Sequence, residues 1–391
     1  MFKRALTIAV GGASASVALV FAGTASPAAR SLASAPASVS CSIPVQIGMM
    51  GPFTGDAASI GDDQLHWALY AANVWNASHK TKIAIVQGDT QLNPAIASTV
   101  SQSFASNSSI VGVIGPAGSQ EVIASSPILK KAGFAFTSGS ATNVTLTNGK
   151  LKGYFFRVVP NDGVQAPTDA DYMMKHLGVT KGSSVMIVDD QESYSTGLAD
   201  IVQADLKKAG VNVDRESITQ KDTDFSALVG KVTSSTKVIF TPFQLSSQTQ
   251  LLAQQLKAQG KTAVVFASDG SFDSSKFNVS GNYVSFFAPD VTTIAADNAI
   301  VAGYHKQFPG GTSPFGAPNY VAVQLYAQAI QSACTAGKGT ITRSSLRLAL
   351  AKQKIAKSLL GTPISFTPDG DVAGAAFHIF KIENGKYVTV A

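Results

Sequence analysis

Two short apolar runs between residues 110 and 147 each end in a turn of small and hydroxyl-bearing residues. The first, Ile110 to Ile114, leads into Gly-Pro-Ala-Gly-Ser at 115–119, and the second, Phe134 to Phe136, leads into Thr-Ser-Gly-Ser-Ala-Thr at 137–142. In an open α/β sheet the carboxyl ends of neighbouring parallel strands share one crevice. Small residues there let backbone N–H groups approach an anion. The pattern predicts an α/β fold with a crevice suited to a carboxylate.

Similar β-type runs alternate with helical patterns along most of the chain, which favours mostly parallel sheets over a β-sandwich. The runs form two series, separated after Pro160. We expect strands at 45–50, 82–87, 110–114, 134–137 and 154–158, then at 184–189, 211–218, 237–241, 263–267 and 283–287. The two series predict two Rossmann-like lobes.

The last quarter of the chain returns to helix and then to hairpin-like sequence. Apolar spacing predicts helices over about 319–330 and 344–356. Two β-type runs follow at 364–366 and 376–382, separated by Pro-Asp-Gly-Asp, and Asn384-Gly385 predicts a tight turn.

Composition is that of a large globular protein. The 391 residues are 45% apolar and 14% charged, which is enough to bury a core and favours two domains. The formal charge of +6 overstates the basic character, because Lys3, Arg4 and Arg30 lie in the first 35 residues. Without them the balance is 27 basic (30 − 3) to 24 acidic residues, or +3. No block of five Lys or Arg occurs, which argues against nucleic acid as a partner.

The first residues have the pattern of an export signal. Residues 1–4 carry two positive charges, Lys3 and Arg4, and Ala5 to Gly23 are apolar. Residues 24–40 have the Ala/Ser/Pro composition of a tether. We expect residues 1–41 to be signal and tether, with cleavage around Ala25 to Ala29 or after Ala35. An uncleaved anchor is the alternative. In either case the folded part would be periplasmic or associated with the outer cell surface.

Two cysteines, Cys41 and Cys334, lie near opposite ends of the folded part. Cys41 opens the first strand and Cys334 lies near a helix end, and these share the face of a βα layer away from the crevice. Since an exported protein meets an oxidising compartment, we expect a disulfide. Lipid attachment at Cys41 is the alternative, but Ser-Val-Ser precedes it where such a signal has Leu followed by small residues.

Several short motifs occur in the order seen in type I periplasmic binding proteins. They are Ile47 to Gly55, Ile114-Gly115-Pro116 with Ser119, Ser138 to Asn143, Phe156-Arg157 with Pro160 and Asp162, Tyr194 with Gly197, Ser268-Asp269-Gly270, and Phe366 with Asp369-Gly370-Asp371. Over about residues 44–390 the chain resembles the leucine/isoleucine/valine-binding branch, the solute receptors of ABC importers.

The resemblance implies two lobes that close on a small-molecule ligand and are joined by three crossings. We place the crossings near Val158 to Asp162, Phe287 to Val291 and Gly361 to Phe366. Lobe one would comprise 42–159 plus 290–360, and lobe two 160–289 plus 361–391. We expect a monomer without cofactor or metal that passes its ligand to an ABC transporter permease.

The resemblance also implies roles for individual residues if the ligand is an amino acid. Such a ligand needs donors for its carboxylate, an acceptor for its ammonium and a wall for its side chain. The candidates are Ser119, Thr142 and backbone N–H groups around Gly118, Ser140 and Thr142 for the carboxylate, Asp269 for the ammonium, and Tyr194 with Phe243 or Gln244 from the second lobe.

Each candidate also has a purely structural interpretation. Ser119 and Thr142 could cap helices, Asp269 could be a turn residue, and Tyr194 could lie on the surface. The family often has an aromatic residue before the glycine of its first loop, whereas this chain has Ile60 before Gly61. The sequence therefore leaves the identity of the ligand open.

Signals for catalysis are absent from the sequence. It has no Gly-x-Ser-x-Gly, no Gly-x-Gly-x-x-Gly and no complete phosphate-binding Gly-Lys-Ser/Thr loop. The five histidines are scattered and none has a second ligand at metal spacing. Two rivals to an amino acid receptor stay open: a receptor for another small solute, such as an amide, urea or an aromatic acid, and a secreted hydrolase on an α/β scaffold.

Overall fold

The computed structural model describes residues 37–310, 313–374 and 376–391. The predicted export signal, its predicted cleavage sites and most of the predicted tether lie outside these residues. Within the described ranges, no helix combines the length and the apolar character needed to cross a membrane.

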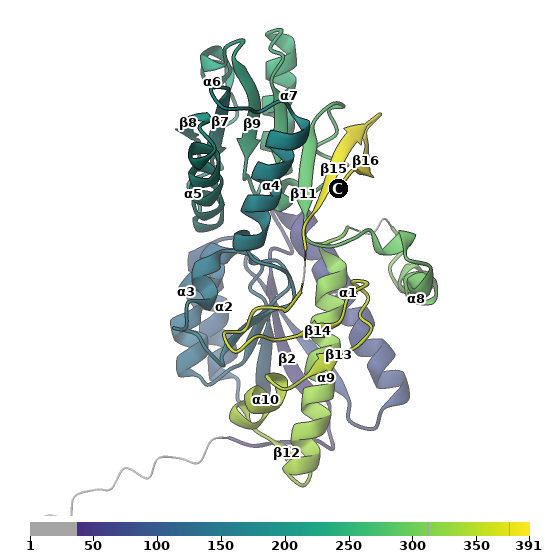
Figure 1. Cartoon of the computed structure of the whole chain (residues 1–391). Helices are drawn as coiled ribbons and strands as arrows, with labels where there is room; N and C mark the ends of the chain where they lie inside the picture. Colours follow the sequence, from purple (N-terminus) through teal and green to yellow (C-terminus); the bar gives the residue numbers. More distant parts are fainter. Residues whose placement is uncertain (1–36, 311–312, 375) are drawn as a thin grey trace, which may run out of the picture. The chain divides into compact units, whose positions relative to one another are not determined.

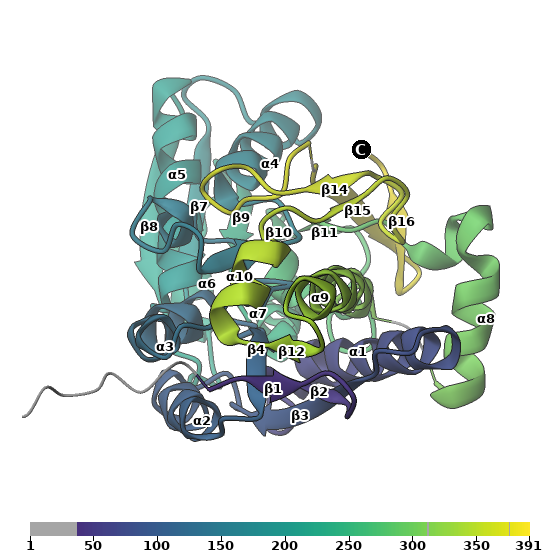
Figure 2. The ribbon, with the colours of Figure 1, turned by 90° about the horizontal axis from the view of Figure 1, so that it is seen from below.

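The first lobe is built on a five-stranded parallel sheet in the order β3-β2-β4-β5-β6. In Figure 1, α2 and α3 lie on one side of this sheet and α1 and α9 on the other, and Figure 2 shows α1 and α9 next to one another. The elements are β2 (Val45–Gly51), α1 (Ala58–Ser78), β3 (Ile83–Asp89), α2 (Pro94–Ser106), β4 (Ile110–Ile114), α3 (Ser119–Lys131), β5 (Phe136–Ser138), β6 (Phe155–Arg157), α9 (Gly316–Ala336) and α10 (Arg343–Leu350).

The second lobe has a seven-stranded sheet in the order β16-β15-β11-β10-β9-β7-β8. The five strands β7 to β11 are parallel to one another, and β15 and β16 add an antiparallel edge. Its elements are α4 (Asp162–His176), β7 (Ser184–Asp189), α5 (Ser193–Lys208), β8 (Asn212–Ser217), α6 (Ser226–Lys231), β9 (Thr236–Thr241), α7 (Ser246–Ala258), β10 (Val264–Ala267), β11 (Tyr283–Phe286), β15 (His378–Glu383) and β16 (Lys386–Thr389).

Several short elements complete the fold. Strand β1 (Val39–Ser40) pairs with β12 (Thr340–Ile341), and β13 (Lys354–Ile355) pairs with β14 (Ile364–Ser365). The remaining elements are η1 (Val144–Thr147), η2 (Asp269–Ser271), η3 (Val291–Thr293), η4 (Ala295–Asp297) and α8 (Asn298–Gln307).

The predicted α/β class, with two mainly parallel sheets, is confirmed. The prediction was wrong in the C-terminal quarter. Helix α10 ends at Leu350 rather than at about 356, because Lys354–Ile355 pairs as a strand with Ile364–Ser365. The run at 376–382 likewise pairs with β11 and β16 rather than with 364–366. The expected turn at Asn384-Gly385 joins β15 to β16, and both residues have positive φ.

The segment from Phe366 to Val372 packs against the first lobe. Phe366 bridges to Val372, its ring lies 4.8 Å from that of Phe156, and the Arg157 N–H donates to the Gly370 carbonyl at 3.0 Å. We therefore propose that the third crossing lies after Val372, between β14 and β15. Residues 361–372 would then belong to the first lobe, where the sequence led us to expect the second.

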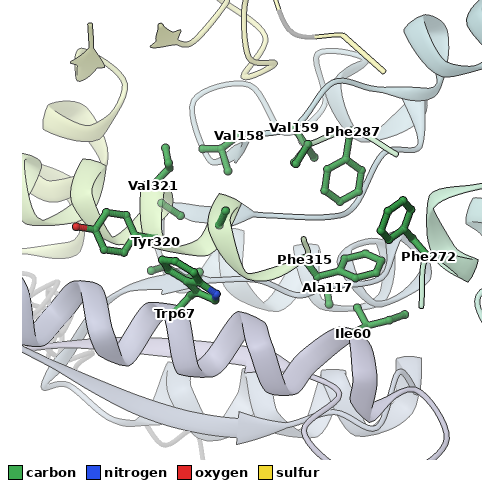
Figure 3. Packing of buried hydrophobic residues seen from close by; sticks show 14 of the residues in the cluster. Ile60, Trp67, Ala117, Val158, Val159, Phe272, Phe287, Phe315, Tyr320 and Val321 are labelled. Atoms are coloured by element: carbon green, nitrogen blue, oxygen red, sulfur yellow. The ribbon is translucent and has the colours of Figure 1, made fainter. Parts of the chain in front are cut away.

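Close helix packing in the first lobe depends on one small residue and on several large aromatic side chains. A Cβ atom at Gly112 would come within 2.5 Å of the Tyr326 ring, so only glycine lets α9 approach β4 this closely. Trp67 of α1 stacks on Tyr304 of α8 at 4.1 Å and meets Tyr320 of α9 edge-on at 5.8 Å. Figure 3 shows Trp67 and Tyr320 within this apolar core.

A disulfide joins Cys41 and Cys334, which are 293 positions apart in the sequence. Cys41 follows β1 and Cys334 lies near the end of α9, so the bond lies beside the β1–β12 pair. It closes a loop around nearly the whole described chain. A bond that closes a long loop removes many conformations from the unfolded state.

We expect replacement of both cysteines, Cys41→Ser with Cys334→Ser, to lower the free energy of unfolding by about 2–4 kcal/mol. The reason is the larger conformational entropy of the unfolded chain without the cross-link. Urea unfolding of the double variant and of the oxidised parent measures the difference. Equal midpoints and slopes for the two proteins would contradict this account.

Candidate functional site

The loop after β4 brings Gly118 and Ser119 to the N-terminus of α3. The Gly118 N–H donates to the Glu121 carboxylate at 2.7 Å. A Cβ atom on Gly118 would lie 2.9 Å from the end of the Leu92 side chain, which would have to shift to admit it. The Ser119 hydroxyl accepts the Asn143 N–H at 3.2 Å, which connects this loop to the one after β5.

The loop after β5 is held by hydroxyl groups of its own. Ser138 donates to the Pro116 carbonyl at 2.7 Å and accepts the N–H groups of Ser140 and Ala141. Ser140 donates to the Ala117 carbonyl at 2.8 Å and accepts from Gln64 at 2.9 Å. The N–H groups of Gly118 and Ser140, two of the predicted carboxylate donors, thus have acceptors within the chain.

Thr142 follows in the same loop and is bracketed by the Arg157 guanidinium. Arg157 Nη1 donates to the carbonyls of Ala141 at 3.1 Å and Asn143 at 2.9 Å, while Nε donates to Asp371 at 2.5 Å. The Arg157 side chain is fully buried. The Thr142 hydroxyl is buried too, and among the described residues it has no hydrogen-bond partner.

The second lobe contributes Asp269 from η2 and Tyr194 from α5. The Tyr194 hydroxyl lies 2.6 Å from Asp269 Oδ1 and 2.6 Å from Ser268 Oγ, and its single proton serves one of them. Gln165 of α4 donates to the same Asp269 oxygen at 2.7 Å. Both Asp269 and Tyr194 are 3% exposed, which rules out a surface position for Tyr194 and an exposed turn for Asp269.

Burial dominates the electrostatics of this region. It raises the pKa of Asp269 to about 6 against the lowering effect of its bonds to Tyr194 and Gln165. It raises the pKa of Asp162 to about 7, with a further increase from Asp269. The pKa of Asp169 is also raised by burial and by those two carboxylates. A cationic group near Asp269 would therefore relieve repulsion among buried acids.

A cavity of about 20 Å³ lies between the groups described above. Both lobes contribute to its lining, with polar groups from Ser119, Ser140, Tyr194, Gln244 and Asp269, glycines 118 and 270, and an apolar wall of Ile60, Leu92, Ala117 and Phe315. Figure 3 shows Ile60, Ala117 and Phe315, and the Phe315 ring lies 5.8 Å from that of Phe287, just after β11. The volume suits about one water molecule.

Phe243 does not line this cavity, in contrast to the sequence-based expectation. Its ring is fully buried in the core, 6.5 Å from Phe225. Gln244, the alternative, lines the cavity instead. Its side chain exchanges hydrogen bonds with Gln120 of the first lobe at 2.7 and 3.3 Å. A further bond between the lobes runs from the Asn143 side-chain amide to the Ser193 carbonyl at 2.7 Å.

The helix-capping interpretation does not describe Ser119 or Thr142. Gly118 is the N-cap of α3, and Ser119 bonds to the neighbouring loop rather than to its own helix. The N-cap of η1 is Asn143. The structure thus brings Ser119, Ser140, Tyr194, Asp269 and Gly118 around one cavity, with Thr142 buried in the same loop as Ser140.

Sequence reasoning missed the acidic face of α4. Asp162, Gln165 and Asp169 are spaced at i, i+3 and i+7, which places them on one helix face. Gln165 contacts Asp269, and Asp169 accepts from Ser285 at 3.1 Å. The spacing was visible in the sequence, but nothing there showed that this face meets Asp269. Within the residues described, no three His, Cys, Asp or Glu side chains are grouped so as to hold a metal ion.

Comparison with known proteins identifies the family. Residues 44–386 match the family described as periplasmic binding protein. A Leu/Ile/Val-binding protein homolog of Brucella melitensis is 29% identical over 88% of this chain and 93% of its own. The fold is similar to that of the branched-chain amino acid transporter substrate binding protein LivJ of Streptococcus pneumoniae, solved with isoleucine (TM-score 0.78, 24% identity, 89% of this chain and 100% of that one). It is also similar to an ABC transporter solute binding protein of R. palustris, solved with benzoate (TM-score 0.77, 15% identity, 89% and 96%).

The chain belongs to the periplasmic binding protein family. It is a substrate-binding protein of the ABC transporter type, and family membership implies export. Because this family binds solutes and does not catalyse reactions, the alternative of a secreted hydrolase is excluded.

Arg157→Lys tests how the site loop is held. A lysine has three donors in a different geometry and cannot serve Asp371 and both loop carbonyls as the guanidinium does. We expect a loss of about 1–3 kcal/mol in the free energy of unfolding for a buried acceptor that is left without a donor. Urea unfolding gives the value.

The matched control is Lys152→Ala. Lys152 pairs with Asp369 at 3.2 Å between the same two segments, but both side chains are at least half exposed. Such a pair contributes about 0–1 kcal/mol. Equal losses in the two variants would show that the buried pair has no special role.

Proposed function

We propose that the protein binds a branched-chain or related amino acid between its two lobes and delivers it to the permease of an ABC importer. The observation that carries this proposal is the complementary lining of one cavity. Ser119 supplies a hydroxyl from the first lobe, Asp269 supplies a carboxylate from the second, and Ile60, Leu92 and Phe315 supply an apolar wall. These groups suit a carboxylate, an ammonium and an aliphatic side chain.

The name of the Brucella melitensis relative, a Leu/Ile/Val-binding protein homolog, supports the same ligand class. A cavity of about 20 Å³ is too small for such a ligand, so the lobes must part for the ligand to enter, and the site must be wider with the ligand bound than in this structure. We further propose that the protein acts outside the cytoplasm as a monomer. The predicted signal and the disulfide support this location.

The second candidate is a receptor for an organic acid without an ammonium group. The Phe315 ring in the cavity wall would suit an aromatic acid, and the R. palustris protein solved with benzoate has the same fold. Under this alternative Asp269 would have no cationic partner.

We expect leucine, isoleucine or valine to raise the melting temperature, because a ligand at a hundred times its Kd stabilises the folded state by about 2.7 kcal/mol. Asp269→Asn should weaken binding at least about 30-fold, since it removes the charged acceptor of the ammonium. Thermal shift followed by calorimetric titration measures both effects.

Asp171→Asn is the control, because Asp171 is exposed and pairs only with Lys175 at the surface of α4. It should bind as the parent does. Among ligands, 4-methylpentanoate lacks the ammonium and leucinamide lacks the carboxylate. Binding of 4-methylpentanoate that is as tight as that of leucine, and unaffected by Asp269→Asn, would establish the organic acid receptor and overturn the amino acid proposal.

A further inference from the structure

A second cavity, of about 540 Å³, is also lined by both lobes. Its volume falls within the range of about 300–1,000 Å³ that is usual for small-molecule sites in proteins. The cavity of the candidate site, at about 20 Å³, is far smaller. The amino acid site proposed above makes no use of the larger cavity.

Three segments of the chain line both cavities, so the two are neighbours. The segments are the start of α1, the loop before α9, and η2 with the loop after it. The residues of each segment are divided between the small and the larger cavity as follows: Ile60 against 59, 62 and 63; Phe315 against 313 and 314; and 269–270 against 272–275. Ile60 and Phe315 therefore lie at the boundary between the two cavities.

Aromatic rings connect the wall of the small cavity to the lining of the larger one. Figure 3 shows Phe315 and Phe272 at the same end of the apolar cluster. The Phe286 ring lies 4.9 Å from Phe315 and 4.4 Å from Phe272. Phe272 in turn lies 4.9 Å from Phe380 and 4.6 Å from Tyr387, and these three rings line the larger cavity. An apolar chain that leaves the small cavity along Phe315 would stay on an apolar surface.

Long hydrogen bonds join the lobes at the edge of the larger cavity. Lys276 of the second lobe donates to the Asp56 carbonyl and to the Ser59 hydroxyl of the first lobe, both at 3.4 Å. Since each cavity has one side in each lobe, parting of the lobes to admit a ligand widens both cavities together.

The charged groups that line the larger cavity are mostly acidic. There are four carboxylates and one ammonium, a balance of 1 − 4 = −3, or −2 if the nearby Lys276 is included. The groups in the lining are Asp62, Asp63, Asp273, Asp290 and Lys386. This balance favours a cationic occupant over an anionic one.

Two of these carboxylates have the capacity to accept further hydrogen bonds. Asp62 is exposed and has no hydrogen bond or ion pair within the described part of the chain. The Oδ2 atom of Asp273 is buried without a hydrogen-bond donor there, and the nearest ammonium, that of Lys276, is 4.0 Å away. Asp63, in contrast, already accepts from Tyr304 and from the Ser313 N–H.

We propose that the larger cavity is a subsite for the far end of a long, cationic ligand side chain. The α-carboxylate and α-ammonium would bind at the candidate site, the methylene chain would pass between Ile60 and Phe315 onto Phe272, and the terminal cation would lie near Asp62 and Asp273. This inference rests on the proposed function, which places the head of the ligand. It extends the ligand class from branched-chain amino acids to amino acids with long basic side chains.

Lysine and norleucine form a matched pair of ligands, because they have the same carbon chain and differ by the terminal ammonium. In calorimetric titration of the purified protein, lysine should bind at least about threefold more tightly than norleucine, since a partly exposed ion pair contributes up to about fivefold. Added salt should reduce this ratio by screening the pair. The anionic homologue 2-aminoadipate should bind more weakly than norleucine.

Two charge variants should move the ratio of lysine to norleucine affinity in opposite directions. Asp62→Asn removes an exposed carboxylate and should lower the ratio about two- to fivefold, whereas Lys386→Ala removes the ammonium in the lining and should raise it. Asp171→Asn, an exposed carboxylate on α4 outside both cavities, is the control and should leave the ratio unchanged.

Ile60→Trp tests the path between the cavities. The larger side chain would fill the boundary, so it should weaken binding of lysine and norleucine more than that of alanine, which has no chain to pass. Circular dichroism checks that the variant is folded. An equal effect on all three ligands in the folded variant would contradict the path, and the two charge variants decide the subsite if this variant does not fold.

The outcomes separate the subsite from the proposed function. If leucine binds but lysine binds no more tightly than norleucine, or if both charge variants leave the ratio unchanged, the subsite is overturned and the proposed function stands. If no amino acid binds but hexanoate does, the proposed function fails, and 6-aminohexanoate against hexanoate then tests the subsite by the same ratio. If none of these ligands binds, both proposals are overturned.

Discussion

The buried guanidinium of Arg157 links the site loop to the crossing between the lobes. Its three nitrogens donate to the carbonyls on either side of Thr142, to the hydroxyl of Thr147 and to Asp371. A fully buried cation is tolerable only where it is paired and hydrogen-bonded, and Arg157 makes four such bonds. Because Asp371 belongs to the segment from Phe366 to Val372, the same side chain holds that segment and the loop that carries Thr142.

Side chains of the two lobes also contact each other directly. Gln120 and Gln244 exchange amide hydrogen bonds across the cleft, and Gln220 and Asp190 hold the Gln244 amide and backbone from the second lobe. These bonds can form without a ligand. A ligand shifts the equilibrium toward the closed state only through contacts that exist in that state and not in the open one.

The strands of both lobes could be predicted from the sequence, because each is a short apolar run followed by small polar residues. Strand β4 and strand β7 have the bounds expected for them. The sequence could not show which of two adjacent residues faces the cavity. Phe243 and Gln244 are neighbours just after β9, so they point to opposite sides, and only the packed lobe shows that Phe243 enters the core.

The end of α10 and the acidic face of α4 eluded prediction for a related reason. Residues 351–356 continue a helical pattern, yet Ile355 gains a strand partner in Ile364, which no local signal reveals. Asp162 and Gln165 have a helical spacing that is equally typical of a solvated face. Asp162 contacts Thr142 and Gln165 contacts Asp269. Both partners lie on other segments of the fold, so the sequence of α4 alone does not show that this face meets the candidate site.

The two lobes divide the chemistry of the proposed site between them. In the proposed site the first lobe would supply the Ser119 hydroxyl, and the second would supply the Asp269 carboxylate, to which the Tyr194 hydroxyl donates. A zwitterion with its two charged ends held apart by one carbon would satisfy both sets only when the lobes are together. A ligand with one charged end would bind to one lobe and gain little from the other. The same arrangement that selects the ligand would therefore also couple its binding to closure.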